Sequence, residues 1–135
     1  MSDSEMPDRE LKRILYVEDE PDIQKIARMA LEMVGGFTVH ICSSGQEAVE
    51  TATEFAPDLI LLDVMMPGMD GPTTLKALRE IDSLAKTPVA FMTAKVQPPE
   101  VEEYKRLGAI SVIPKPFDPM TLSAQVNEVW AARDG

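Results

Sequence analysis

Short apolar runs along the chain alternate with longer stretches in which apolar residues recur at helical spacing. Residues 59–62 read LILL with no polar position, which predicts a strand covered on both faces, as in a parallel sheet flanked by helices. After the first apolar run, apolar residues recur at i, i+3, i+4, i+7, i+8 and i+11, which is one face of a helix: Ile23, Ile26, Ala27, Ala30, Leu31 and Val34. The same alternation then repeats to the end of the chain.

Glycine and proline divide the chain into five rounds of strand followed by helix. Strands are expected at residues 13–17, 37–42, 59–62, 88–93 and 110–113. Helices are expected from Pro21 to Gly35-Gly36, from Ser44 or Gly45 to Pro57, from Gly71-Pro72, after Pro98-Pro99, and over Leu122, Val126 and Val129. The inward positions of the middle helices are expected to be Ala48, Ala52, Phe55, Leu75, Leu78, Val101, Tyr104 and Leu107.

The alternation and the composition both indicate one doubly wound α/β domain. Strict alternation forces crossover connections, and right-handed crossovers place helices on both faces of a five-stranded parallel sheet. A chain of 135 residues with 44% hydrophobic and 27% charged residues is typical of a single globular core. Residues 1–10 are polar and acidic and are expected to form a flexible arm, which leaves residues 11–135 for the domain.

The formal net charge of −10 narrows the classes of partner. A polyanion repels a phosphate backbone, so direct binding of nucleic acid is disfavoured, whereas divalent cations are attracted. The chain has no run of about 18 apolar residues, and its start lacks a secretory signal, so a cytoplasmic protein without membrane insertion is expected. Cys42, the one cysteine, agrees with a reducing compartment. Cys42 and His40 share a predicted strand, and we expect both to be structural and far from the strand ends that carry polar residues.

Polar side chains follow four of the five predicted strands: Glu18, Asp19 and Glu20, then Asp63, then Thr93, then Lys115. Each alone has an ordinary explanation, as a helix-terminus acid, a turn residue, a strand end or a solvated charge. The carboxyl ends of parallel strands meet at one edge of the sheet, however, where ligand sites collect. The sequence therefore predicts that these side chains converge on one site.

The combination of residue types at this edge indicates magnesium and phosphate chemistry. Carboxylates that share a crevice repel one another, and a hard divalent cation such as Mg²⁺ relieves that repulsion while leaving coordination for phosphate oxygens. A lysine and a threonine hydroxyl near the same point would hold the remaining oxygens of a phosphoryl group. One carboxylate then becomes a candidate nucleophile that forms an aspartyl phosphate.

Four segments, ILYVEDEP, DLILLDVMMPGMDG, FMTAK and VIPKPF, resemble in this order the receiver domain of two-component response regulators, over roughly residues 11–132. The resemblance implies a flavodoxin-like (βα)5 fold with strand order 2-1-3-4-5. It also implies a signalling switch in which Asp63 takes a phosphoryl group from a sensor histidine kinase or a histidine phosphotransfer protein. An output protein, which the sequence does not identify, would then bind the surface formed by the fourth helix, fifth strand and fifth helix.

The resemblance also implies a role for each site residue. Glu18 and Asp19 form the acidic pair that serves Mg²⁺, with Asp19 and Asp63 as direct ligands and Glu18 acting through water. Met65 adds its backbone carbonyl, while its thioether is expected to fill a gap in packing. Such a domain is not an enzyme, although it promotes its own phosphotransfer and a slow autodephosphorylation.

Thr93 is expected to bind a phosphoryl oxygen and move with it, and Lys115 to pair with the phosphoryl group. A cis bond between Lys115 and Pro116 is implied as well. Three residues before Lys115, receivers usually carry Tyr or Phe, and this chain has Val112. Because valine has no ring to swing, we expect the signal to leave through displacement of the helix at about residues 100–107. Tyr104 could supply the missing aromatic, although its spacing favours a core-facing anchor.

Rival interpretations share the fold and differ in chemistry. A haloacid-dehalogenase-like phosphatase would need a second acidic residue two positions after the nucleophile, where this chain has Met65. A flavin-binding flavodoxin asks for a hydroxyl- and glycine-rich phosphate loop, and the acids of EDEPD would repel a phosphate without a metal. A degenerate receiver would lack one of the expected residues, and all are present. A phosphate sink, or a receiver fragment of a hybrid kinase or larger regulator, stays open.

Overall fold

Five parallel strands form the centre of the molecule in the order β2-β1-β3-β4-β5, as the resemblance implied. The computed structural model describes residues 10–133, so the predicted arm lies outside the described residues except for Glu10. The strands are β1 (Arg13–Val17), β2 (Thr38–Cys42), β3 (Leu59–Asp63), β4 (Val89–Thr93) and β5 (Ser111–Pro114). The central strand β3 is buried along its whole length, which explains its lack of polar alternation.

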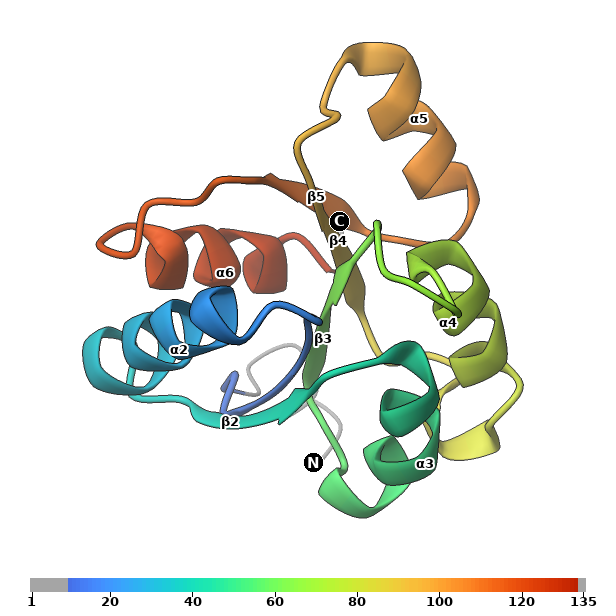
Figure 1. Ribbon diagram of the computed structural model, residues 1–135, viewed down its shortest axis with the longest axis horizontal. Coiled ribbons are helices and arrows are strands. Elements are labelled where there is room, and N and C mark those ends of the chain that lie inside the picture. The colour runs from blue at the N-terminus through green and yellow to red at the C-terminus, as the bar shows by residue number, and fades with distance from the viewer. Residues whose placement is uncertain (1–9, 134–135) are drawn as a thin grey trace, which may run out of the picture.

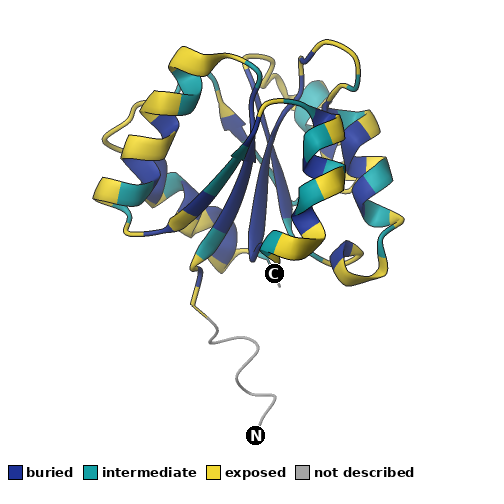
Figure 2. Ribbon diagram, turned by 60° about the horizontal axis from the view of Figure 1, so that its bottom comes forward, coloured by how far each residue is buried: buried dark blue, intermediate teal, exposed yellow. Residues whose placement is uncertain are grey.

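Helices cover both faces of the sheet (Figure 1). They are α2 (Pro21–Met29), the π-helical turn η1 (Ala30–Val34), α3 (Gly45–Phe55), α4 (Gly71–Arg79), the 3₁₀ turn η2 (Asp82–Leu84), α5 (Pro98–Arg106) and α6 (Leu122–Ala131). One face carries α2 and α6, and the other carries α3, α4 and α5, with a hydrophobic core on each side. Figure 2 shows the buried strands between the two helical layers. Within residues 10–133, the structure contains no helix with the length and apolarity of a membrane span.

The first helical stripe is only partly buried, contrary to expectation. Ala27, Ala30 and Leu31 face the core, but Ile26 is 44% exposed and Val34 is 52% exposed. The cause at the C-terminal end is the π-helical turn, in which Gly35 N bonds to Ala30 O over a wider ring than in an α-helix. The widened turn rotates Val34 off the stripe that a period of 3.6 residues would give.

The helix α5 also departs from its predicted face. Pro98 and Pro99 are its first two residues, where the missing N–H groups cost no intrahelical bond, whereas we expected them to precede it. Tyr104 is buried and Val101 is half-buried, but Leu107 follows the last helical residue and is 44% exposed. The inward face of α5 therefore depends mainly on one aromatic ring.

Cys42 lies closer to the carboxyl edge of the sheet than expected. It is the last residue of β2, and its carbonyl accepts a hydrogen bond of 3.0 Å from Glu18 N, so the placement far from this edge was wrong for its backbone. Its thiol turns toward α3, where Cys42 Sγ and His40 Nε2 lie 3.4 Å and 3.2 Å from Thr51 Oγ1. Both side chains thus make packing contacts with a helix.

Candidate functional site

Three carboxylates meet where β1 and β3 end side by side. Glu18 and Asp19 follow β1 directly, and Asp63 is the last residue of β3. One oxygen from each carboxylate lies within 4.8 Å of the others. The Glu18 side chain is fully buried and Asp63 is 4% exposed, whereas Asp19 is half-buried at the rim. Glu20, at the N-cap of α2, is exposed and is not one of the three.

The ammonium group of Lys115 bridges two of these acids from the other side of the crevice. Lys115 Nζ lies 2.9 Å from Glu18 Oε1 and 3.3 Å from Asp63 Oδ1. Its backbone N donates to Thr93 O at 2.9 Å, which ties the end of β5 to the end of β4. The bond from Lys115 to Pro116 is cis, as predicted.

Tyr16 adds a contact that we did not predict. Its hydroxyl donates to Glu18 Oε1 at 3.2 Å, and Glu20 N donates to Glu18 Oε2 at 3.1 Å. The sequence did carry a signal for this contact, because residues two apart on a strand face the same side. Tyr16 and Glu18 hold that spacing in the segment YVE.

Burial and charge shift the acid–base balance of the site. Burial, followed by the negative charge of Glu18, raises the pKa of Asp63 to about 6, although the Lys115 ammonium opposes the shift. Burial alone would lower the pKa of Lys115, but its hydrogen bond to Glu18 and the charge of Asp63 raise it overall. Burial and the neighbouring Glu18 carboxylate raise the pKa of the Tyr16 phenol well above its usual range, so this phenol stays a hydrogen-bond donor.

The loops around the acids place the remaining predicted residues. Thr93 ends β4 beside β3, is 3% exposed, and accepts a hydrogen bond of 3.0 Å from Lys95 N on its hydroxyl. Met65 lies in the loop after β3, and its side chain is 69% exposed. The expectation that its thioether fills a gap in the core was therefore wrong. Gly71 closes this loop: a Cβ there would lie 2.7 Å from Asp63 O, which only glycine avoids.

The comparison with known families identifies the family to which the chain belongs. Residues 14–127 match the family model described as the response regulator receiver domain. The chain belongs to the response regulator receiver domain family. Receivers are signalling domains of two-component systems, they bind Mg²⁺ at an acidic cluster, and response regulators interact with histidine kinases.

Individual relatives agree with this assignment. The receiver is similar to the chemotaxis protein CheY4 of Vibrio cholerae, with 31% identity and a TM-score of 0.81 over 89% of this chain and 99% of that structure. It is similar to the signal receiver domain of a histidine kinase from Syntrophus aciditrophicus, with 32% identity and a TM-score of 0.74 over 87% of this chain and 89% of that one. It is also 38% identical over 114 residues to the uncharacterized transcriptional regulatory protein YkoG of Bacillus subtilis, covering 84% of this chain and 49% of that relative. The chain therefore spans about half the length of such curated relatives.

Proposed function

We propose that this receiver accepts a phosphoryl group on Asp63 and that the modified state changes which partner protein it binds. One observation carries the proposal: the buried carboxylate of Asp63 shares its crevice with two further acids and with the ammonium of Lys115. A carboxylate held beside a fixed cation is pre-organised to carry added negative charge. Solubility or helix capping requires no such convergence from separate strands.

The acidic group has the chemistry that Mg²⁺ requires. The oxygens of Glu18, Asp19 and Asp63 approach within 4.8 Å, and Mg²⁺ prefers hard oxygen ligands. We propose that Asp19 and Asp63 bind the ion directly, that Glu18 acts through water, and that the backbone carbonyl of Met65 adds a further ligand. When bound, Mg²⁺ would offset the negative charge of the carboxylates and of the incoming phosphoryl oxygens.

Phosphoryl transfer uses the nucleophilic oxygen of Asp63. An oxygen–phosphorus bond forms as the phosphorus–nitrogen bond of a donor phosphohistidine breaks, and the electron pair of that bond stays on the imidazole. The products are an aspartyl phosphate on this chain and a free histidine on the donor. We propose a sensor histidine kinase or a histidine phosphotransfer protein as that donor.

We propose that Lys115 and Thr93 respond to the new charge. Lys115 Nζ already lies 3.3 Å from Asp63 Oδ1 and would pair with a phosphoryl oxygen at this point. The Thr93 hydroxyl accepts from Lys95 N and keeps its own hydrogen to donate. Donation to a phosphoryl oxygen would draw Thr93, and the loop that carries Lys95, toward Asp63.

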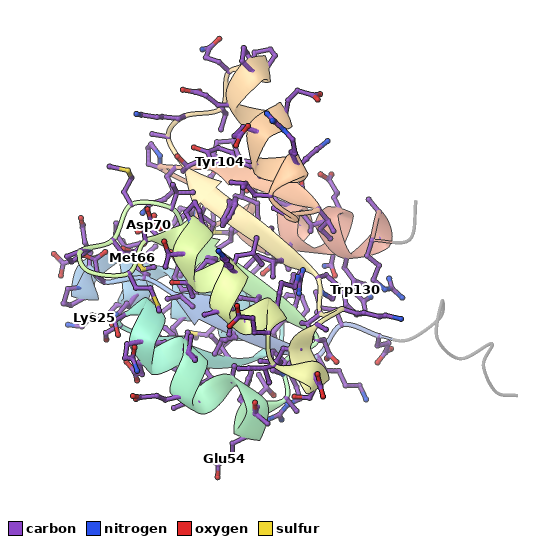
Figure 3. All side chains as sticks on the ribbon, turned by 90° about the vertical axis from the view of Figure 1, so that its right-hand side faces the viewer. Lys25, Glu54, Met66, Asp70, Tyr104 and Trp130 are labelled. Carbon is purple, nitrogen blue, oxygen red and sulfur yellow. The ribbon has the colours of Figure 1, made fainter. Side chains whose placement is uncertain are left out.

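The signal would reach the surface formed by α5, β5 and α6. Val112 on β5 is half-buried and packs against the core that contains Tyr104 and Phe91. The Tyr104 and Phe91 rings meet edge to face with centroids 5.3 Å apart, and Figure 3 labels Tyr104 at the base of α5. This contact makes Tyr104 a core anchor that links α5 to the strand ending at Thr93. We propose that α5 moves as a unit when Thr93 moves, and that an output protein reads the change.

The same chemistry would serve a phosphate sink, which is a receiver that only accepts phosphoryl groups in competition with another regulator. It would also serve a receiver within a hybrid kinase. The similarity to the receiver domain of a Syntrophus aciditrophicus histidine kinase supports this second candidate. In each case we propose a receiver over residues 11–135 that promotes its own phosphotransfer and a slow autodephosphorylation. A haloacid-dehalogenase-like phosphatase is disfavoured because Met65 stands where its second acid is needed.

Phosphotransfer from histidine kinases of the same genome tests this function. The wild-type receiver should take label from at least one phosphorylated kinase or phosphotransfer protein when Mg²⁺ is present. Asp63→Asn should take none, and Asp58→Asn serves as the control because Asp58 bonds to the backbone at the opposite end of the sheet. Equal labelling of wild type and Asp63→Asn would refute the assignment.

A further inference from the structure

Tyr16 connects the core beneath α2 and α6 to the acidic site. Its side chain is fully buried among the residues of that core, and its hydroxyl lies 3.2 Å from Glu18 Oε1. In the sheet Tyr16 pairs with Ile41 of β2 and with Leu61 of β3, so it is held by strands on both sides. A buried ring in a packed core has a fixed position, and its hydroxyl therefore marks a fixed point in the crevice.

Glu18 Oε1 receives hydrogen bonds from two elements far apart in sequence. Tyr16 donates from β1 at 3.2 Å, and Lys115 donates from the end of β5 at 2.9 Å. The other oxygen, Oε2, accepts from Glu20 N at 3.1 Å. Three donors thus determine the rotation of one fully buried carboxylate, and the Tyr16 donor is the only one of them that belongs to the rigid core.

The Tyr16 hydroxyl also limits how strongly Glu18 holds Lys115. Both donors share Oε1, and a hydrogen bond from Tyr16 reduces the negative charge that this oxygen presents to the ammonium. Lys115 Nζ contacts both carboxylates, at 2.9 Å from Glu18 Oε1 and 3.3 Å from Asp63 Oδ1, so the ammonium is shared between them.

We infer that Tyr16 is a positioning residue of this receiver: its buried hydroxyl sets the orientation of the Glu18 carboxylate for Mg²⁺ and leaves Lys115 free to serve Asp63. The inference rests on the proposed function, because it assigns Tyr16 a task in the same site. It differs from simple satisfaction of a buried polar group, in which the Tyr16 hydroxyl would affect stability alone. Groups that orient metal ligands from behind typically change metal affinity or activity 10–100-fold when they are removed.

A double-mutant cycle separates these two roles. Mg²⁺ affinity is measured by calorimetry for wild type, Tyr16→Phe, Glu18→Gln and the double variant. Calorimetry is preferred to tryptophan fluorescence, because Trp130 lies toward the other end of the molecule from the loop of Met66 and Asp70 (Figure 3). Tyr16→Phe keeps the ring and removes one oxygen, so we expect about tenfold weaker Mg²⁺ binding. In the Glu18→Gln background the same change should alter affinity less than about twofold, because the group through which Tyr16 acts is gone.

Tyr104→Phe is the matched control, because it removes the same atom from the other buried tyrosine and should leave Mg²⁺ affinity unchanged. Unchanged affinity in Tyr16→Phe, or an equal loss in both backgrounds, overturns the inference while the proposed function stands. Absence of Mg²⁺ binding by the wild type overturns the proposed function and the inference with it. Circular dichroism checks that each variant is folded.

A second readout uses the wild type alone and does not depend on how any variant folds. Because the Tyr16 hydroxyl is buried and donates to Glu18, we expect its proton to exchange slowly with solvent and to be observable by NMR. We expect its resonance to move on addition of Mg²⁺, because the ion changes the charge on the oxygen to which it donates. A hydroxyl resonance that stays fixed while the Asp19 amide moves overturns the inference.

Discussion

The ammonium nitrogen of Lys115 lies 3.3 Å from Asp63 Oδ1, so the proposed acceptor is paired with a cation of the protein itself. The two residues end different strands, and their contact depends on the parallel sheet bringing those ends to one edge. Since Asp63 is 4% exposed, water screens this pair little. Lys115 thus offsets part of the cost that burial and the Glu18 carboxylate impose on a negative charge at Asp63.

Lys115→Ala should destabilise the metal-free protein. Without the ammonium, Glu18 and Asp63 are left as buried carboxylates with no cation beside them, and breaking a buried pair in this way costs about 3 kcal/mol. Mg²⁺ should restore part of that loss. Urea unfolding with and without Mg²⁺ measures both effects, and Lys95→Ala is the control because Lys95 has an exposed side chain. Equal stability of Lys115→Ala and wild type would contradict the account.

The stability of the metal-free protein should depend on the ionisation of Asp63. Its pKa is raised from 3.8 to about 6, so the folded state binds this proton more tightly than the unfolded state does. This proton therefore contributes to the free energy of unfolding at low pH. The contribution is lost as the pH rises from about 3.8 to about 6, because ionising Asp63 in its buried site is unfavourable. Asp63→Asn should therefore be more stable than wild type, by up to about 3 kcal/mol at neutral pH, since one pKa unit corresponds to about 1.4 kcal/mol.

The difference in free energy of unfolding between Asp63→Asn and wild type should be small near pH 4 and should increase up to about pH 7. Thermal unfolding in metal-free buffers across this range measures it. A gap that is constant with pH, or one that narrows as the pH rises, would show that the burial of Asp63 does not disfavour its charge.

Thr93→Val should separate phosphorylation from signalling. Valine keeps the branched shape of threonine and removes the hydroxyl that we expect to bind a phosphoryl oxygen. The variant should still form the beryllofluoride–Mg²⁺ complex at Asp63, but the response of the loop that carries Lys95 should be lost. Thr93→Ser, which keeps the hydroxyl, should retain the response. NMR shifts of that loop decide the matter, and a full response in Thr93→Val would rule out the proposed role.

The route through α5 predicts where the wild type changes on activation. Since Val112 offers no ring to swing, the movement should appear in residues 95–110, as faster or slower amide hydrogen exchange in the beryllofluoride–Mg²⁺ complex. Changes confined to the loops around Asp63, with none in residues 95–110, would favour a phosphate sink over a switch.

The strand ends were predictable because each signal is local. An apolar run followed at once by a polar residue, as at Asp63, identifies a buried strand and its carboxyl end, and the parallel class then brings such ends together. The receiver motifs supplied the strand order and the cis bond before Pro116. Periodicity gave the core positions of most helices for the same reason, since the faces of a regular helix follow from spacing alone.

The features that escaped prediction depend on contacts between distant parts of the chain. The π-helical turn at η1 lies against α6, where Ser123 Oγ donates to Ala30 O at 2.9 Å, and no local pattern records such a bond. The exposure of Val34 follows from that turn. The spacing of Tyr16 and Glu18 along the strand predicts that their side chains lie on the same side. The role that we infer for this contact also depends on Lys115, which follows β5 and donates to the same Glu18 oxygen.

Intact-mass analysis of the wild type and of Asp63→Asn after incubation with acetyl phosphate tests the central claim most directly. The account predicts that the wild type gains the mass of one phosphoryl group when Mg²⁺ is present and gains none when the metal is chelated. It predicts no gain for Asp63→Asn under either condition. An equal mass gain in both proteins, or a gain in the wild type that is indifferent to Mg²⁺, would contradict the assignment of Asp63 as the acceptor in a magnesium-dependent site.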